Sequence, residues 1–191
     1  MTKGRMEAFS DGVIAIIMTV MVLEFHVPHS ADAHALALLW PKILSYALSY
    51  LFLGIYWTNH HHLLQAIKHV DGAVLWANIH LLFWLSLTPF VTAWIGESHF
   101  AEVPVASYGV ILLMSGTAFF ILTRTLLHVH GRDSTLGHAV GADFKGKISL
   151  LIYAAAIAAA FFQPLVSCAM YVLVAAIWLV PDRRIERAMA S

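Results

Sequence analysis

Long apolar runs separated by short polar segments dominate the chain. Four of these runs lie at about residues 7–27, 37–64, 73–95 and 103–127. Each is long enough for a helix that crosses the roughly 30 Å hydrocarbon core of a bilayer, which takes about 20 residues. A polar stretch rich in glycine, histidine and charged residues follows at 128–147 and predicts a loop. The pattern therefore predicts a membrane protein built from helices.

The last apolar run, residues 148–180, is too long for one span. As a single helix it would be about 50 Å long at 1.5 Å per residue. Phe162-Gln163-Pro164 lies near its middle, and proline breaks a helix and restricts the residue before it. We therefore expect two short spans joined by a tight turn. This gives an all-α membrane protein of six transmembrane helices, organised as a single domain over residues 1–191.

The basic residues favour six spans with both termini in the cytoplasm. Of the eleven Lys and Arg residues, only Lys42 then falls in an outside segment, which leaves ten inside. Cytoplasmic loops carry such an excess of positive charge. A five-span topology would instead place the three arginines of 183–187 outside.

One alternative for the first run is a signal peptide. Lys3 and Arg5 precede the apolar stretch, and the small residues of 30–33 follow it, as in a secretory signal. Asp11 and Glu24 within the same stretch are unusual for a signal, so we favour a retained span.

Composition excludes several classes of protein. The chain is 60% hydrophobic and 12% charged, whereas soluble domains are about 45–50% apolar and about 25% charged. A water-soluble enzyme and a disordered chain are both disfavoured. The 11 basic and 11 acidic residues cancel, so no overall field points to a nucleic-acid partner.

Polar side chains inside the first three runs are the leading candidates for function, because such groups are costly in a membrane. In the six-span topology they lie at one depth, near the cytoplasmic ends of three helices. We predict a polar clasp there; a proton relay or a binding site is the sharper alternative. The residues concerned are Arg5, Phe9, Ser10 and Asp11 in the first run, Asn59, His60 and His61 in the second, and Asn78 and Trp84 in the third.

We expect neither a metal site nor a catalytic site. His60, His61 and His62 are consecutive, so on a helix they point about 100° apart and cannot converge on one ion. The i, i+4 pair of a His-Glu-x-x-His motif is missing from the sequence. Asp11 and Glu24 would lie roughly 20 Å apart along a helix, too far for an acid/base pair. The sequence therefore predicts no enzyme and no cofactor.

The first helix has a smooth apolar stripe opposite its polar residues. On a helical wheel with Ile16 at zero, Ser10 and Asp11 lie more than about 100° away. If that polar side faces the other helices of the subunit, the Ile16 side faces outward, toward lipid or toward a symmetry mate. The stripe holds Phe9, Gly12, Val20 and Leu23 within about 40° of Ile16, and Thr19 at about 60°.

The sequence resembles the transmembrane protein 175 family of potassium channels. The string Arg5-x-x-x-Phe9-Ser10-Asp11 at the start of the first of six helices is similar to the family motif. The histidine and tryptophan clusters of the second and third runs and the Trp178–Arg183 segment are similar as well. The resemblance covers nearly the whole chain.

The resemblance implies an assembly and a pore. Prokaryotic members carry one six-helix repeat and form tetramers, whereas animal members carry two repeats and dimerise. The first helices line a central pore with an apolar constriction, whose narrowest ring corresponds to Ile16. Val20 and Leu23 correspond to further pore-facing positions, and Thr19 to a threonine that some bacterial members use one turn above the ring. Val20 is smaller than the leucine expected at its position, which implies a wider upper pore.

The sequence is thus interpreted as a homotetrameric, moderately potassium-selective channel. It would lie in the cell membrane as a multi-pass protein, with lipid and permeant K⁺ as its partners. The main alternative is a proton-coupled secondary transporter that uses Asp11 and the histidines of the second helix. An integral-membrane enzyme that binds haem or metal through its histidines is a third possibility.

Overall fold

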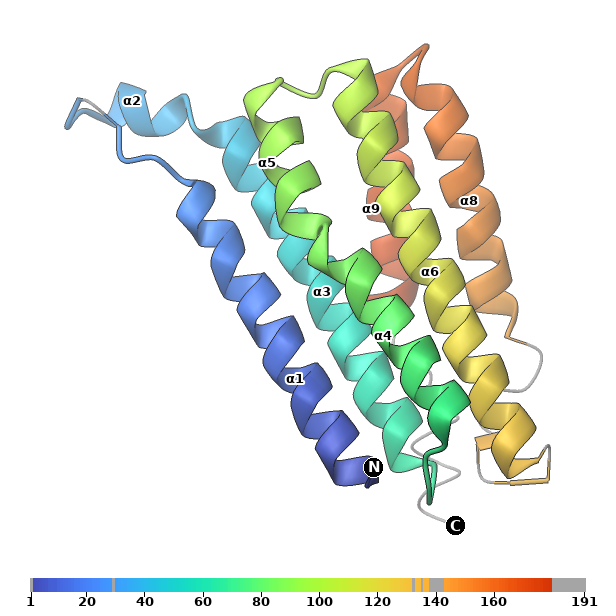
Figure 1. Ribbon diagram of the computed structural model, residues 1–191. Helices are drawn as coiled ribbons and strands as arrows, with labels where there is room; N and C mark the ends of the chain where they lie inside the picture. Colours follow the sequence, from blue (N-terminus) through green and yellow to red (C-terminus); the bar gives the residue numbers. More distant parts are fainter. Residues whose placement is uncertain (1, 29, 132, 135, 138–142, 180–191) are drawn as a thin grey trace.

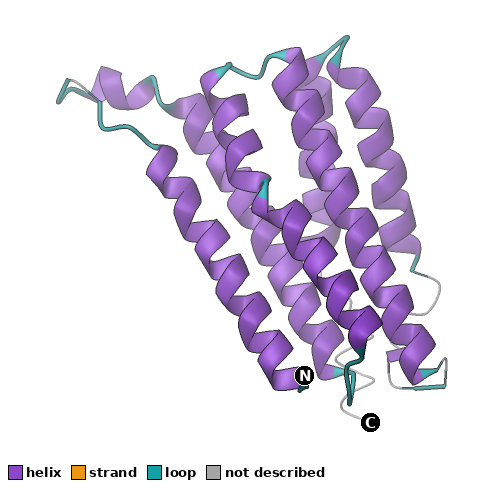
Figure 2. Ribbon diagram, viewed as in Figure 1, coloured by secondary structure: helices purple, strands orange, loops and turns teal. Residues whose placement is uncertain are grey.

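The computed structural model describes residues 2–28, 30–131, 133–134, 136–137 and 143–179. Regular structure in these segments is helical throughout, with no strand among them (Figure 2). The long helices run alternately up and down a single bundle, with α1 inclined along one side (Figure 1). The elements are α1 (Lys3–Val20), the 3-10 turn η1 (Met21–Glu24), α2 (Ala33–Ala37), α3 (Trp40–Gln65), α4 (Gly72–Ser86), α5 (Thr88–Glu97), α6 (Glu102–His130), α8 (Phe144–Ala160) and α9 (Pro164–Leu179).

Most helix ends follow the local sequence. Asp71 and Asp143 precede α4 and α8, and each carboxylate accepts a hydrogen bond from a backbone N–H of the first turn. The tight turn expected around Phe162 is present, because α8 ends at Ala160 and α9 begins at Pro164. The polar loop is shorter than expected at both ends, since α6 continues to His130 and α8 begins at Phe144.

The third apolar run differs from expectation, because it forms two helices. Leu87 ends α4 and precedes α5, whose first turn contains Pro89. Proline has no N–H to donate to the preceding turn, so the α-helical hydrogen-bond pattern is interrupted there. Within the described residues, three stretches are long and apolar enough by length and composition to cross a membrane: Lys3–Glu24, Gly72–Glu97 and Glu102–His130.

Two groups of buried apolar side chains form the core. One joins α1, α3, α4 and α6 and includes Ile14, Leu64 and Leu122. The other joins α3, α5, α6, α8 and α9 and includes Tyr108 and Tyr171. α1 thus contributes to the first group only, and α3 and α6 link the two groups.

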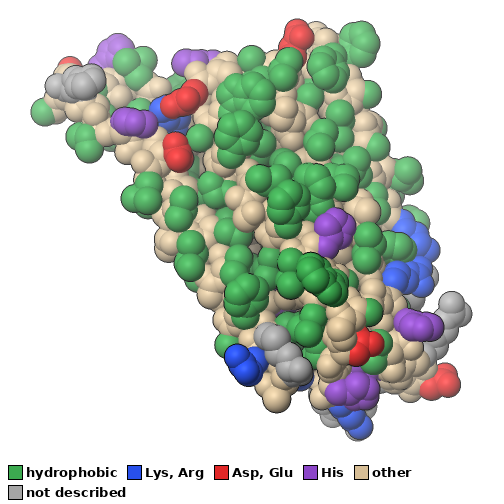
Figure 3. All heavy atoms as spheres, in the orientation of Figure 1, with side chains coloured by type: hydrophobic (Ala, Val, Ile, Leu, Met, Phe, Trp, Pro, Cys, Tyr) green, Lys and Arg blue, Asp and Glu red, His purple; other side chains and the backbone are tan. Residues whose placement is uncertain are grey.

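Basic side chains gather toward one end of the bundle. Hydrophobic side chains cover most of the face in Figure 3, and basic ones lie mainly at its lower end. At the opposite end Lys42 forms an ion pair with Glu97 at 3.2 Å. Arg132 and the three arginines of 183–187, which the topology prediction also uses, lie outside the described residues.

Candidate functional site

α1 presents two different faces. Its buried side consists of Met6, Ser10, Ile14 and Ile17, which pack toward α3 and α4. On the opposite side four large apolar side chains are exposed, although burial would be favourable for each. Their exposed fractions are 54% for Phe9, 63% for Ile16 and 38% for Val20, and 75% for Leu23 in η1, the turn that continues α1.

Thr19 lies on the same exposed side as Ile16. Its hydroxyl donates to the carbonyl oxygens of Ala15 and Ile16, at 3.1 and 3.0 Å. Such bonds within a helix satisfy a hydroxyl without a second partner. The threonine oxygen therefore keeps acceptor capacity on the exposed stripe.

A buried hydrogen-bond chain joins α1, α4 and α3. Asn78 Nδ2 donates to Ser10 Oγ at 2.9 Å, and Ser10 Oγ donates to the Met6 carbonyl at 2.9 Å. The other end of the same amide, Asn78 Oδ1, lies 2.7 Å from His60 Nε2. Ser10, Asn78 and His60 are each at most 1% exposed. Burial makes this chain costly to break, because each lost partner leaves a desolvated polar group.

The hydrogen bonds also indicate the tautomer of His60. Because Asn78 Oδ1 can only accept, His60 Nε2 is the donor. The neutral ring then has its lone pair on Nδ1, which is buried and has no partner among the described residues.

Polar contacts that are less buried surround this hydrogen-bond chain. Asp11 Oδ1 accepts a hydrogen bond from Trp57 Nε1 at 3.0 Å, which ties α1 to α3. Glu7 and His61 form an ion pair at 3.2 Å when His61 is protonated. Both side chains of that pair are partly exposed, so it contributes about 1 kcal/mol at most.

The predicted clasp residues therefore separate into groups. Ser10, Asn78 and His60 form one network, and Asp11 bonds Trp57 rather than a histidine or an asparagine. Asn59 lies outside the network, because its Nδ2 donates to the Ile55 carbonyl of its own helix at 2.8 Å. The other predicted members are elsewhere: Trp84 donates to His80, Phe9 is on the exposed stripe, and Arg5 is exposed.

Two contact residues were not among the predicted clasp residues. Glu7 lies one turn before Asp11 on α1, and this i, i+4 spacing of two carboxylates was the available signal. Trp57 stands at the start of the polar string of the second run, but its indole N–H was not assigned to Asp11. Among the described residues no group of three or more His, Cys, Asp or Glu side chains could hold a metal ion.

Comparisons with known proteins agree with this arrangement of helices. Residues 5–89, which hold both the α1 stripe and the buried chain, match a family model described as the endosomal/lysosomal potassium channel TMEM175. A potassium channel of Chryseobacterium sp. (strain P1-3) is 52% identical over 189 residues, which cover 99% of this chain and 98% of that protein. The chain belongs to the TMEM175 family.

Two further relatives extend the comparison. The crystal structure of a lysosomal potassium-selective channel TMEM175 homolog from Chamaesiphon minutus matches with a TM-score of 0.83 and 29% identity, over 94% of this chain and 97% of that one. The mouse protein named endosomal/lysosomal proton channel TMEM175 is 30% identical over 173 residues, which are 81% of this chain but 33% of the mouse protein. TMEM175 is a family of membrane ion channels, which is not an enzyme class.

Proposed function

We propose that this TMEM175 protein is a potassium channel in which four copies surround a pore lined by α1. The observation that carries the proposal is the exposed apolar stripe of α1, with Ile16 at 63% exposure. The polar contacts of α1 face inward onto α3 and α4. Its apolar side is therefore available to face an axis shared with other copies. Closed rotational symmetry would bring identical stripes together around that axis.

Ile16 is proposed as the narrowest ring, with Val20 and Leu23 on the same side and Thr19 one turn above it. A ring of isoleucine side chains supplies no ligand, so a cation must lose part of its hydration there. K⁺ holds its water less tightly than Na⁺, which gives a moderate preference for K⁺. The relatives from Chryseobacterium and Chamaesiphon minutus are named potassium and potassium-selective channels, which supports this ion.

We further propose that the chain is a single six-span domain in the cell membrane. α1, α3, the α4–α5 pair, α6, α8 and α9 are its spans, and both termini are cytoplasmic. Support comes from the alternating helix directions in Figure 1. The basic residues near the start of α1 support the orientation. Surrounding lipid and permeant K⁺ are the only small partners that this function requires.

Flux from proteoliposomes under a K⁺ gradient tests the function. We expect K⁺ efflux at channel rates that needs no proton gradient, and slower Na⁺ efflux from matched vesicles. Efflux that stops when the proton gradient is collapsed would instead identify a coupled transporter that uses Asp11 and the α3 histidines. Native mass measurement in mild detergent tests the assembly, and a stable monomer that still conducts would reject the shared pore.

A further inference from the structure

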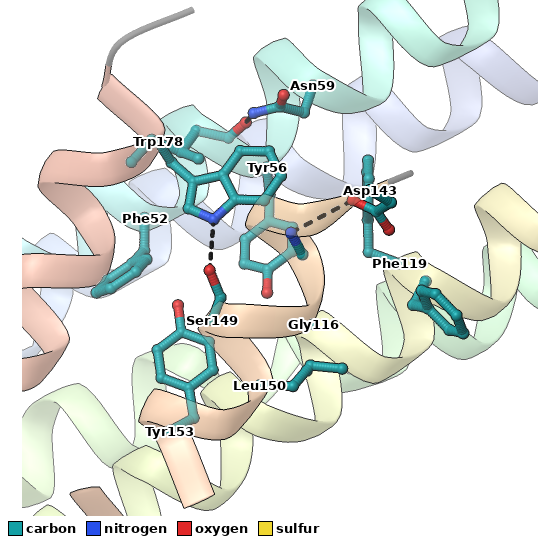
Figure 4. Close-up of a pocket in the computed structure, with 13 residues that line it drawn as sticks. Phe52, Tyr56, Asn59, Gly116, Phe119, Asp143, Ser149, Leu150, Tyr153 and Trp178 are labelled. Atoms are coloured by element: carbon teal, nitrogen blue, oxygen red, sulfur yellow. Dashed lines mark hydrogen bonds between the residues drawn. The ribbon is translucent and has the colours of Figure 1, made fainter. Parts of the chain in front are cut away.

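A partly open cavity away from α1 lies between α3, α6, α8 and α9. Its volume is about 50 Å³. Six of its 13 lining residues are aromatic, and Figure 4 shows several of these rings turned toward the same space. The rings belong to Phe52, Tyr56, Phe119, Phe120, Tyr153 and Trp178.

Two phenol groups in this wall have unused hydrogen-bonding capacity. Tyr153 is only 3% exposed, and Tyr56 is partly buried. Neither hydroxyl has a hydrogen-bond partner among the described residues, and both side chains line the cavity. Each phenol can donate one hydrogen bond, so an acceptor atom inside the cavity would find a donor there.

The other polar side chains of the wall already make hydrogen bonds. Ser149 Oγ accepts a hydrogen bond from Trp178 Nε1 at 2.9 Å (Figure 4) and donates to the Lys145 carbonyl at 2.8 Å. Asp143 Oδ1 accepts from the Gly146 N–H at 3.3 Å, and Asn59 Nδ2 donates to the Ile55 carbonyl at 2.8 Å. The two tyrosine hydroxyls therefore remain as donors that an oxygen inside the cavity can engage.

A second hollow lies directly beside this cavity. It is a groove of about 440 Å³ between α3 and α9. Ile55, Asn59 and Trp178 line both spaces, so they form the common wall. The remaining groove residues are mainly apolar or aromatic, including Leu51 and Leu179. An apolar chain could lie in the groove while its polar end reaches past Trp178.

We propose that the cavity and groove together bind a neutral amphipathic molecule from the bilayer, with an oxygen at one end of an apolar chain. The oxygen accepts from Tyr56 or Tyr153, and the chain occupies the groove. Among the described residues that line the cavity there is no Lys or Arg to hold an anion, and the Asp143 carboxylate would repel one. A cation would gain little, because that carboxylate is engaged at the start of α8. This site requires no pore and stands independently of the proposed function.

The site is tested with the full chain in phosphatidylcholine nanodiscs. The probe is an octanol derivative with a photoreactive diazirine on its chain, and labelled residues are located by mass spectrometry. We expect saturable labelling of peptides from the cavity and the groove. Excess octanol should protect these peptides at lower concentration than octanoate or octylamine does. Stronger protection by either charged compound would overturn the proposal that the bound molecule is neutral.

Three variants sharpen the assignment. Tyr153→Phe removes one donor and should weaken protection by octanol about fivefold, which is the effect of one hydrogen bond. Tyr46→Phe is the matched control, because this α3 phenol lies outside both hollows; its protection should equal that of the wild type.

Gly116→Val fills the cavity, since a side chain there would project toward Leu150 and the two phenols. Labelling of cavity peptides should fall at least tenfold. Labelling that is unsaturable, or unchanged in both Tyr153→Phe and Gly116→Val, would show that the cavity holds water alone and would overturn the proposal.

Discussion

At the scale of single residues, Asn78 is the centre of the contact between α1 and the rest of the subunit. Its amide uses both ends, donating to Ser10 and accepting from His60. We predict that Ser10→Ala lowers stability by about 1–3 kcal/mol, because the buried Asn78 Nδ2 then lacks its acceptor. Thermal unfolding of the purified variant in detergent measures the loss.

Ser86→Ala is the control for this substitution. Ser86 is exposed, and its hydroxyl bonds only the Phe83 carbonyl of its own helix. Its unfolding midpoint should stay at the wild-type value. Equal midpoints for Ser10→Ala and Ser86→Ala would contradict the view that the buried chain holds α1 in place.

The partners within the clasp illustrate how far sequence reasoning reaches. Topology predicted that polar residues of three helices meet at one depth, and Ser10, Asn78 and His60 do meet. Topology could not predict that Asp11 would accept its hydrogen bond from Trp57 rather than from a histidine or an asparagine. Asp11 is about 100° around the helix from Ser10, and only packing determines which neighbour each direction meets.

At the scale of elements, run length predicted where the long helices lie but not how they are interrupted. The turn before Pro164 was expected because the run there was too long for one span. The run containing Pro89 had the length of a single span, so its proline gave no reason to divide it. The break at Leu87 follows from the missing proline N–H and the packing of α5 against α3 and α6.

The contact between α6 and α9 depends on a glycine. A Cβ atom at Gly109 would collide with the Tyr171 hydroxyl and approach Ile157 Cγ1 to 2.8 Å. We predict that Gly109→Ala costs about 1–3 kcal/mol through overpacking. Gly54→Ala on α3 is the control, because a Cβ there meets no atom within 4 Å and alanine favours helix by about 1 kcal/mol. If Gly109→Ala unfolds at the temperature of Gly54→Ala or above it, this close approach does not constrain the bundle.

The short helix α2 should respond to acid. A hydrogen bond from Ser30, and a weaker effect from the Ala35 N–H, lower the pKa of Asp32 below its usual 3.8. A lowered folded-state pKa means that the cap stabilises α2 above the usual value and loses its effect as pH falls through the lowered one. We expect the protection of the α2 amides, measured as exchange relative to the intrinsic rate at each pH, to fall over that acidic interval. Ser30→Ala should move this loss of protection to higher pH, and an unchanged profile would show that Ser30 does not set this pKa.

At the scale of the whole molecule, α1 is the element whose packing within one subunit is least complete. It contributes to only one of the two core groups, and large apolar side chains remain exposed along it. Lipid could cover such a stripe at no cost, so exposure by itself does not select a pore. Contact with other copies and contact with lipid differ in one respect. Around a shared axis the Ile16 side chains would control ion passage, whereas against lipid they would not.

The Ile16→Asn variant distinguishes a pore-facing Ile16 from a lipid-facing one. In a shared pore, asparagine would place amide oxygens at the narrowest point, keep it hydrated and coordinate either ion. We therefore predict larger currents and a lower K⁺/Na⁺ permeability ratio, measured from reversal potentials in mixed K⁺ and Na⁺ solutions. Ile79→Asn is the matched control, because Ile79 is 45% exposed and belongs to α4 rather than to the α1 stripe; the permeability ratio of this variant should equal that of the wild type. If a well-folded Ile16→Asn channel kept the wild-type ratio, Ile16 would face lipid or another surface, and the selective ring would have to be sought elsewhere.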